Sequence, residues 1–246
     1  MENEICEVSS RNDDRMSENE AISFNADMMK DSVQKYVLWL DIMGIKEKMS
    51  RSLAQSSNFI AKFHAAIQRY SNGLGVVFPA MDGAYIIFDT SVDAKKFIGC
   101  FFQLISKTFM NDEHKHQFIV RAGLAHGRVY RCDDILPALS ESDSKRLTSL
   151  SLIVGFAVIQ AHLAEKEAPP FGVAIHESAR EVMENGKTVF CGSWYRWAIA
   201  LQWSQSLRHA MEDYFKWCRE HYLEIGYDIK ALERHELSAE QYFSPF

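Results

Sequence analysis

The chain has 246 residues, of which 47% are hydrophobic and 24% are charged, a length and balance typical of one domain with extensions rather than two full domains. Its formal net charge of -6 argues against a protein that grips duplex nucleic acid, because that affinity comes mainly from neutralising phosphates. The chain has no run near the roughly 20 apolar residues that span a bilayer and no signal-peptide pattern, so a cytoplasmic protein without a membrane segment is expected.

The N-terminal part predicts a tail followed by a central strand. Residues 1–30 are rich in Glu, Asp, Asn and Ser and show little periodicity, which indicates a flexible acidic tail. The apolar run from Tyr36 to Leu40 then ends in Asp41 and is typical of a buried central strand. Because chemistry often lies at the C-terminal end of such a strand, Asp41 is the first candidate site residue.

A helix and a hairpin are expected next. After Gly44 the apolar residues follow one helical stripe, which residues 71–73 end. Two short apolar runs then flank Asp82 and Gly83, a dipeptide typical of a tight two-residue hairpin turn. Adjacent central strands would bring Asp41 and Asp82 to one sheet edge, where paired carboxylates suit Mg²⁺ or Mn²⁺. The alternative is a helix cap at Asp41 and a simple turn at Asp82.

The second half of the chain alternates strands and helices. A capping box at Thr90 predicts a helix to Phe109, and a strand follows over residues 118–130. Residues 133–149 are expected to form a loop with a short helical turn. Residues 152–165 predict a helix almost free of charge, which suggests a face buried against a partner or another element.

The C-terminal part completes an α+β pattern. A strand over residues 171–175 and a short helix over 176–184 are expected, and a long amphipathic helix through 207–222 leads to a weakly ordered end. The element order predicts a sheet covered by helices. The core would span residues 31–195, with a C-terminal helical extension over 196–246.

Five segments, in order, resemble the class III nucleotidyl cyclases, the catalytic domain of adenylate and guanylate cyclases. The segments are Val37–Ile45, Met81–Phe88, Val120–Val129, Val154–Glu165 and Val173–Ala179. They are similar to that family's first metal-binding strand, Gly-Asp hairpin, Arg-x-Gly strand, long helix motif and following strand. The resemblance covers roughly residues 34–190 and implies a ferredoxin-like βαββαβ core with a mainly antiparallel sheet.

The resemblance also implies residue roles. Asp41 and Asp82 would be the catalytic residues that bind two ions, Mn²⁺ or Mg²⁺, with the carbonyl of Ile42 as a further ligand. The turn from Met43 through Gly44 and Ile45 to Lys46 would hold the triphosphate through its amides, as helix N-termini hold phosphate. Arg121 would be the triphosphate-binding arginine, although an arginine on an edge strand can equally extend along the surface.

Departures from the family pattern reduce the range of nucleotide bases that the resemblance implies. Phe78 and Phe156 occupy positions that read a purine base, while Ile159 and Leu163 replace the transition-state Asn and Arg and cannot donate hydrogen bonds. These features, with the Leu-Asp-Ile-Met-Gly sequence, resemble the pyrimidine cyclases of the bacterial Pycsar antiphage system. That resemblance implies cyclic UMP, or cyclic CMP, made from UTP or CTP to activate a separate effector. Phe78, Phe156 and Gln160 could shape the base pocket, although such residues are more often core or helix surface.

The family's sites form between two subunits, so the resemblance implies a homodimer with residues 152–165 at the interface. The main rival hypothesis is a degenerate domain that binds nucleotide and signals without catalysis, which Ile159 and Leu163 make plausible. A diguanylate cyclase or polymerase-palm relative is a second rival, but the chain has no Gly-Gly-Asp/Glu-Glu-Phe hairpin. A hydrolase with a Ser or Cys nucleophile is the weakest of the rival hypotheses, because the sequence has no nucleophile elbow.

Overall fold

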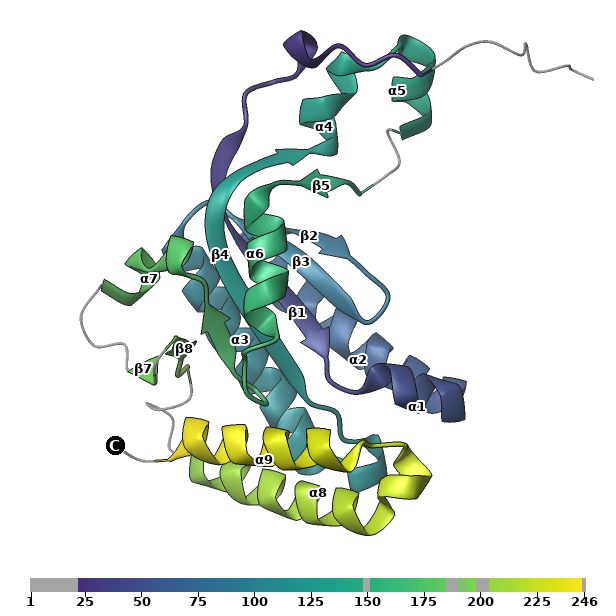
Figure 1. Ribbon diagram of the computed structural model, residues 1–246, viewed down its shortest axis with the longest axis vertical. Coiled ribbons are helices and arrows are strands. Elements are labelled where there is room, and N and C mark those ends of the chain that lie inside the picture. Colours follow the sequence, from purple (N-terminus) through teal and green to yellow (C-terminus); the bar gives the residue numbers. More distant parts are fainter. Residues whose placement is uncertain (1–21, 148–150, 185–189, 192, 198–203, 245–246) are drawn as a thin grey trace, which may run out of the picture.

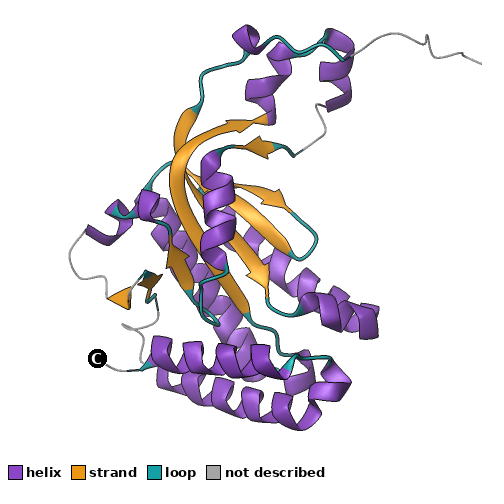
Figure 2. Ribbon diagram, in the orientation of Figure 1, coloured by secondary structure: helices purple, strands orange, loops and turns teal. Residues whose placement is uncertain are grey.

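The computed structural model describes residues 22–147, 151–184, 190–191, 193–197 and 204–244. An eight-stranded, mainly antiparallel sheet forms the centre, in the order β2-β3-β1-β4-β6-β8-β7, and β5 pairs with β4 (Figures 1 and 2). Only the β4–β6 pair is parallel among the described strand pairs. The strands are β1 (Val33–Ile42), β2 (Gly75–Pro79), β3 (Gly83–Phe88), β4 (Val120–Arg131), β5 (Ile153–Val154), β6 (Val173–Ile175), β7 (Phe190–Cys191) and β8 (Trp194–Tyr195). The predicted α+β fold is therefore confirmed.

Helices cover both faces of the sheet because β1 is apolar on both sides. Leu38 and Leu40 pack into the larger core with α2 (Leu53–Ser71) and α3 (Ser91–Asn111). Val37 and Trp39 point to the other face, which α6 (Phe156–Glu165) covers (Figure 1). This alternation along a continuous apolar strand is expected for a central strand with two covered faces. Among the described residues no helix is long and apolar enough to cross a membrane.

The predicted start of α3 is confirmed, whereas α6 begins later than predicted. The Thr90 side chain accepts a hydrogen bond from the Asp93 amide, as a capping box requires. Residues 153–154, expected within the helix, instead form β5 and pair with Tyr130 and Arg131. Gly155 then leads the chain into α6. A Cβ on Gly155 would lie 2.4 Å from the Arg128 carbonyl oxygen, so this close approach to β4 requires a glycine. Pairing to the extended end of β4 therefore shortens the helix.

The segment expected as a loop over residues 133–149 is mostly helical in the described residues. It contains α4 (Cys132–Ile135), η3 (Leu136–Ala138) and α5 (Glu141–Leu147), which lie at the far end of β4 (Figure 1). The described end of the predicted acidic tail lies against this segment through η1 (Ala26–Met28). The Asn25 amide donates to the Ala138 carbonyl at 2.8 Å, so these backbone groups have partners. Residues 1–21 lie outside the described residues.

The C-terminal part forms a helical hairpin. The predicted long helix is confirmed as α8 (Ser204–Ile225), but the weakly ordered end is wrong, because α9 (Ile229–Phe243) follows. Gly226, at φ 68°, reverses the chain, and the Asp228 carboxylate caps α9 by accepting from the Ala231 amide at 2.8 Å. The remaining short elements are α1 (Ile45–Arg51), η2 (His114–His116), η4 (Glu177–Ala179) and α7 (Glu181–Glu184). The last two confirm the short helix predicted after β6.

A candidate two-carboxylate site at one edge of the sheet

The two candidate aspartates lie at the same edge of the sheet. Asp41, at the end of β1, pairs with Gly83 of β3 on one side and with Arg121 of β4 on the other. The Ile42 amide donates a hydrogen bond to the Asp82 main-chain carbonyl at 3.2 Å, which ties the hairpin turn to the end of β1. Burial is the main cause of the raised pKa of Asp41, and the charges of Glu165 and then Asp82 add to it. Two carboxylates 41 residues apart in sequence are thus brought together, as the metal hypothesis requires.

The turn that carries Asp82 lies one residue earlier than predicted, on Met81 and Asp82 instead of Asp82 and Gly83. Pro79 pairs with Ala84, and the Ala80 amide donates to the Gly83 carbonyl at 2.9 Å. Gly83 does not need a left-handed backbone, and its role is instead to leave space. A Cβ there would lie 2.4 Å from the Trp39 ring, so the glycine allows β3 to approach β1 beside Asp41.

The electrostatics of the site centre on Asp41. Burial, and then the negative charges of Glu165 and Asp82, raise the pKa of Asp41 from 3.8 to about 7, against the opposing charge of Arg121. Glu165, only 2% exposed, comes from the last turn of α6. Burial raises the pKa of Glu165, although its ion pair with Arg121 acts in the opposite direction. Like charges are therefore crowded at this edge, an arrangement that a bound cation would relieve.

Sequence reasoning did not assign a role to Glu165. Glu165 is the last residue of the segment that resembles the family's long helix motif, and this position could have marked it as a candidate site residue. Glu165 holds the side chain of Arg121 through an ion pair, and Arg121 Nη1 also donates to the Lys166 carbonyl at 3.3 Å. The arginine predicted to bind triphosphate is therefore positioned by the C-terminal end of α6.

The predicted phosphate turn is brought to the same place as Arg121, but not all of its amides are available. Met43 and Gly44 line one cavity together with Arg121. The Met43 amide, however, donates to the Ile119 carbonyl at 2.9 Å, so in this structure that amide already has a partner. The Ile45 side chain is buried in the core. The amides of Gly44, Ile45 and Lys46 remain the candidates for phosphate.

The three base-pocket candidates lie elsewhere. Phe78 is buried with Trp39 on the face that α6 covers. Phe156 is 78% exposed at the first turn of α6, and Gln160 is partly buried on the same helix. Within the described part of one subunit, none of them lines the cavity beside Arg121. A base pocket that uses Phe156 would therefore have to be completed by other residues.

Comparison with known proteins identifies the fold. No protein-family model and no curated protein sequence matches the chain. The structure of a bacterial light-regulated adenylyl cyclase matches with a TM-score of 0.54 at 15% identity, over 67% of this chain and 49% of that one. An adenylate/guanylate cyclase/hydrolase from Silicibacter pomeroyi matches with a TM-score of 0.49 at 18% identity, over 65% of this chain and 86% of that one. The chain therefore has the fold of class III nucleotidyl cyclase catalytic domains.

The raised pKa of Asp41 predicts a pH-dependent stability difference. Between its ordinary pKa of 3.8 and about 7 the folded state keeps a proton that the unfolded state releases, so the free energy of unfolding falls as pH rises. Asp41→Asn removes this loss. Without divalent cations, the variant should gain stability over wild type on the order of 2 kcal/mol between pH 5 and pH 8. Urea unfolding of both proteins at pH 5 and pH 8 measures this gain. If the stability difference between variant and wild type is the same at both pH values, the raised pKa of Asp41 is refuted.

Proposed function

We propose that this protein is a nucleotidyl cyclase that converts a nucleoside triphosphate into a 3′,5′-cyclic nucleotide and pyrophosphate. The observation that carries the proposal is the meeting of Asp41 and Asp82 at one sheet edge, beside Arg121, in a chain with the cyclase fold. Phosphoryl transfer needs mainly positioning and charge stabilisation, which such an edge can supply.

The residues fit a pair of Mg²⁺ or Mn²⁺ ions that arrive with the substrate. Among the described residues no group of three or more His, Cys, Asp or Glu side chains could hold a metal by itself. These ions commonly use one or two carboxylates together with substrate phosphates, so Asp41, Asp82 and the Ile42 carbonyl would suffice. When bound, the ions would supply activation of the ribose 3′-hydroxyl and neutralisation of the departing pyrophosphate.

The remaining residues of the site would bind and orient the phosphates. The amides that begin α1, after Gly44, favour an anionic group, because helix N-termini carry partial positive charge. Arg121 lines the same cavity and offers a planar set of donors. Glu165 would set the direction of that guanidinium without touching the substrate.

Resemblance to the pyrimidine cyclases of the Pycsar system supports UTP as the substrate, with CTP as the next choice. Phe78 and Phe156, at the base-reading positions, lack the polar groups that would recognise a purine. The product would be a cytoplasmic second messenger of antiphage defence that activates a separate effector. Incubation with each of the four triphosphates and Mn²⁺, with products identified by mass, tests the reaction and the base together. Absence of any cyclic product would refute it.

A catalytically silent nucleotide-binding domain is the second candidate. Ile159 and Leu163 cannot donate hydrogen bonds to a transition state, and the Arg121 guanidinium is already paired with Glu165. Both observations argue against turnover. Saturable binding of a triphosphate without product, measured by calorimetry and mass spectrometry on the same sample, would establish this candidate.

The exposed face of α6 supports a homodimer. Phe156, Ile159 and Leu163 are 78%, 56% and 53% exposed and follow one another at helical spacing. Such an apolar stripe is typical of an interaction surface. Because Ile159 and Leu163 lie where the family has transition-state residues, a partner on this stripe would also bear on catalysis.

We expect Ile159→Lys to weaken the dimer at least about tenfold, because it would bury an unpaired charge at the interface. Leu223→Lys is the matched control, since Leu223 on α8 is 70% exposed and lies on another part of the molecule. Light scattering over a dilution series measures the dissociation, and cyclic nucleotide formation should fall with it. A wild-type protein that is monomeric and active would refute the dimer.

A further inference from the structure

A cavity of about 610 Å³ lies between the candidate site and the C-terminal helical hairpin. Its first wall contains Met43, Gly44 and Arg121, the residues predicted to face the triphosphate. Its second wall contains the turn Ile225–Asp228 and one side of α9. This volume is within the range of small-molecule sites, roughly 300 to 1,000 Å³. The hairpin is therefore part of the surroundings of the candidate site.

The hairpin is held in place at both ends. Near the turn, Arg51 Nη1 of α1 donates to the Glu224 carbonyl at 3.0 Å. At the other end, Arg196 Nη2 donates to the Gln241 carbonyl at 2.9 Å, and the Tyr242 hydroxyl donates to the Tyr195 carbonyl at 2.6 Å. The second wall of the cavity is thus fixed to α1 and to β8, as Figure 1 shows for α8 and α9 below the strand ends.

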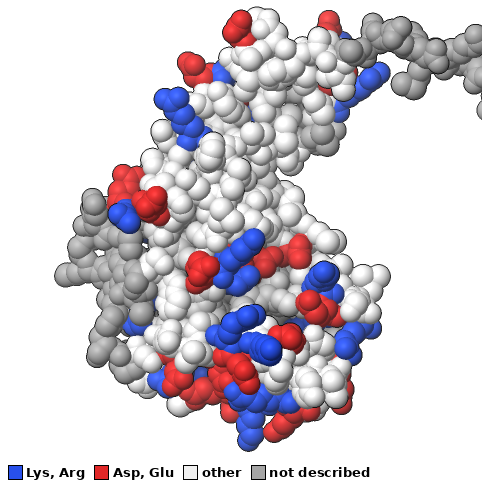
Figure 3. Space-filling model, viewed as in Figure 1, with Lys and Arg blue, Asp and Glu red and all other residues white. Residues whose placement is uncertain are grey.

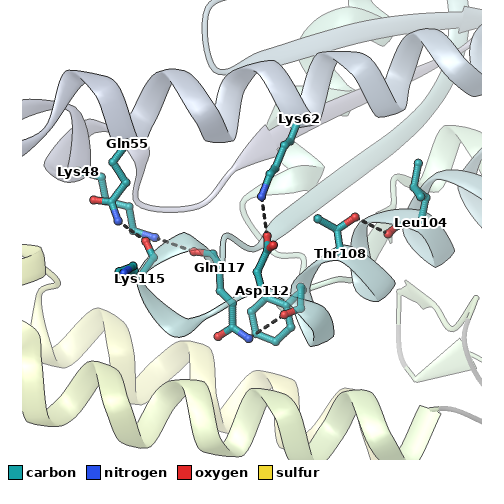
Figure 4. Close-up of polar contacts among 9 residues, drawn as sticks. Lys48, Gln55, Lys62, Leu104, Thr108, Asp112, Lys115 and Gln117 are labelled. Atoms are coloured by element: carbon teal, nitrogen blue, oxygen red, sulfur yellow. Dashed lines mark hydrogen bonds and ion pairs between the residues drawn. The ribbon is translucent and has the colours of Figure 1, made fainter.

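Lys48 adds a contact between α1 and α8. Its ammonium lies 3.3 Å from both the Gln117 carbonyl and the Tyr214 hydroxyl. Figure 4 shows Lys48 extending from α1 to Gln117, just before β4. Although Lys48 lines the cavity, its charge is engaged by these groups.

Two other cations of the cavity are not engaged in this way. Lys166, after α6, and Arg234, on α9, form no ion pair with any residue that the structure describes. Figure 3 shows blue side chains gathered among red ones on this part of the surface. The acids that line the cavity are Glu47, Glu167 and Asp228. Asp228 is already used to cap α9.

Arg121, Arg234 and His235 all line the cavity. Burial and the charges of Arg121 and Arg234 lower the pKa of His235 to about 4, so both guanidinium groups act on this imidazole. His235 itself is uncharged near neutral pH and shares a hydrogen bond of 2.7 Å with the Tyr227 hydroxyl. An anion in the cavity would therefore find an arginine from the sheet edge and an arginine from α9.

We infer that Arg234, assisted by Lys166, binds the terminal phosphates of the nucleotide and the pyrophosphate product, which makes the α8–α9 hairpin part of the substrate site. This inference rests on the proposed function. Arginine suits the role because its planar donors match phosphate oxygens. Arg121 of β4 and Arg234 of α9 line the same cavity, so two elements would supply donors to the anion. The cations that accompany a triphosphate would offset the repulsion from Glu47 and Glu167.

Titration of inorganic tripolyphosphate with Mn²⁺ tests the inference without catalysis. We expect Arg234→Gln to weaken binding about tenfold or more, as for loss of a charged hydrogen bond, and Arg234→Lys to weaken it less. Lys216→Gln is the matched control, because this exposed cation of α8 does not line the cavity. In turnover assays, Arg234→Gln should raise KM and weaken inhibition by pyrophosphate.

Unchanged tripolyphosphate binding in Arg234→Gln would overturn the inference, as would an equal loss in Lys216→Gln. If wild type forms no cyclic nucleotide from any triphosphate, the proposed function fails, but the titration still decides the role of Arg234. Circular dichroism of each variant shows whether the hairpin remains folded. Arg234→Lys keeps the charge and the helix, so it supplies a second, folded comparison.

Discussion

Asp41→Asn and Asp82→Asn are each expected to lower Mn²⁺-dependent cyclic nucleotide formation by roughly 10³-fold or more. The reason is that each asparagine removes a negative charge from a site where two carboxylates would have to hold two divalent cations. Loss of charge stabilisation in phosphoryl transfer has effects of this size. The fold should be preserved, because the side chain keeps its shape and burial already favours the neutral carboxyl, with a pKa of about 7 for Asp41. Initial rates of product formation from the preferred triphosphate measure the effect.

Asp89→Asn is the matched control for these variants. Asp89 follows the opposite end of β3, is exposed, and forms an ion pair with Lys35. The substitution changes the net charge by the same amount, so it separates a site effect from a general electrostatic one. Asp41→Asn with wild-type activity would end the two-carboxylate mechanism. If only Asp89→Asn lost activity, the catalytic site would have to lie at the other end of β3.

Gly123→Val is expected to destabilise the protein by about 3 kcal/mol and to abolish activity. Gly123 lies in the middle of β4, directly beneath α6. A Cβ at this position would lie 2.1 Å from the Ala161 carbonyl oxygen and 2.4 Å from the Glu165 amide nitrogen. Both atoms are helix backbone, so the helix would have to move as a unit, and overpacking of this kind costs roughly 1 to 3 kcal/mol or more. Urea unfolding measures the loss.

The activity should fall further than the stability alone explains, because α6 carries Glu165 and so determines where Arg121 points. Gly99→Ala is the matched control. Within the described residues nothing lies within 4 Å of a Cβ at Gly99, inside α3, so alanine should stabilise that helix by about 0.5 to 1 kcal/mol. A Gly123→Val protein as stable as wild type would show that α6 does not pack on β4 in this way.

Local sequence signals predicted most of the elements near the site. The continuous apolar run before Asp41 predicted a buried central strand, and β1 is central in the sheet. The apolar stripes and the cap at Thr90 predicted α2, α3 and α8. The pairing of two apolar runs around Asp82 predicted the hairpin and hence the meeting of the two aspartates. These features depend on side-chain periodicity and capping, which act over a few residues.

Contacts between distant residues decided the rest. Gly83 leaves space for the Trp39 ring, and the Met43 amide donates to the Ile119 carbonyl. Neither the position of the turn nor the amides left for phosphate could therefore be predicted from local pattern. Glu165 became part of the site only because α6 packs on Gly123.

The sequence by itself thus determined which segments form the strands and helices of the core and which two carboxylates share an edge. The tertiary structure alone decided that β5 shortens α6, that α9 folds back beside α8, and that Arg234 and Arg121 line one cavity. The physical reason is that pairing and packing satisfy backbone groups and bury surface across long chain separations, which a local window of sequence does not contain.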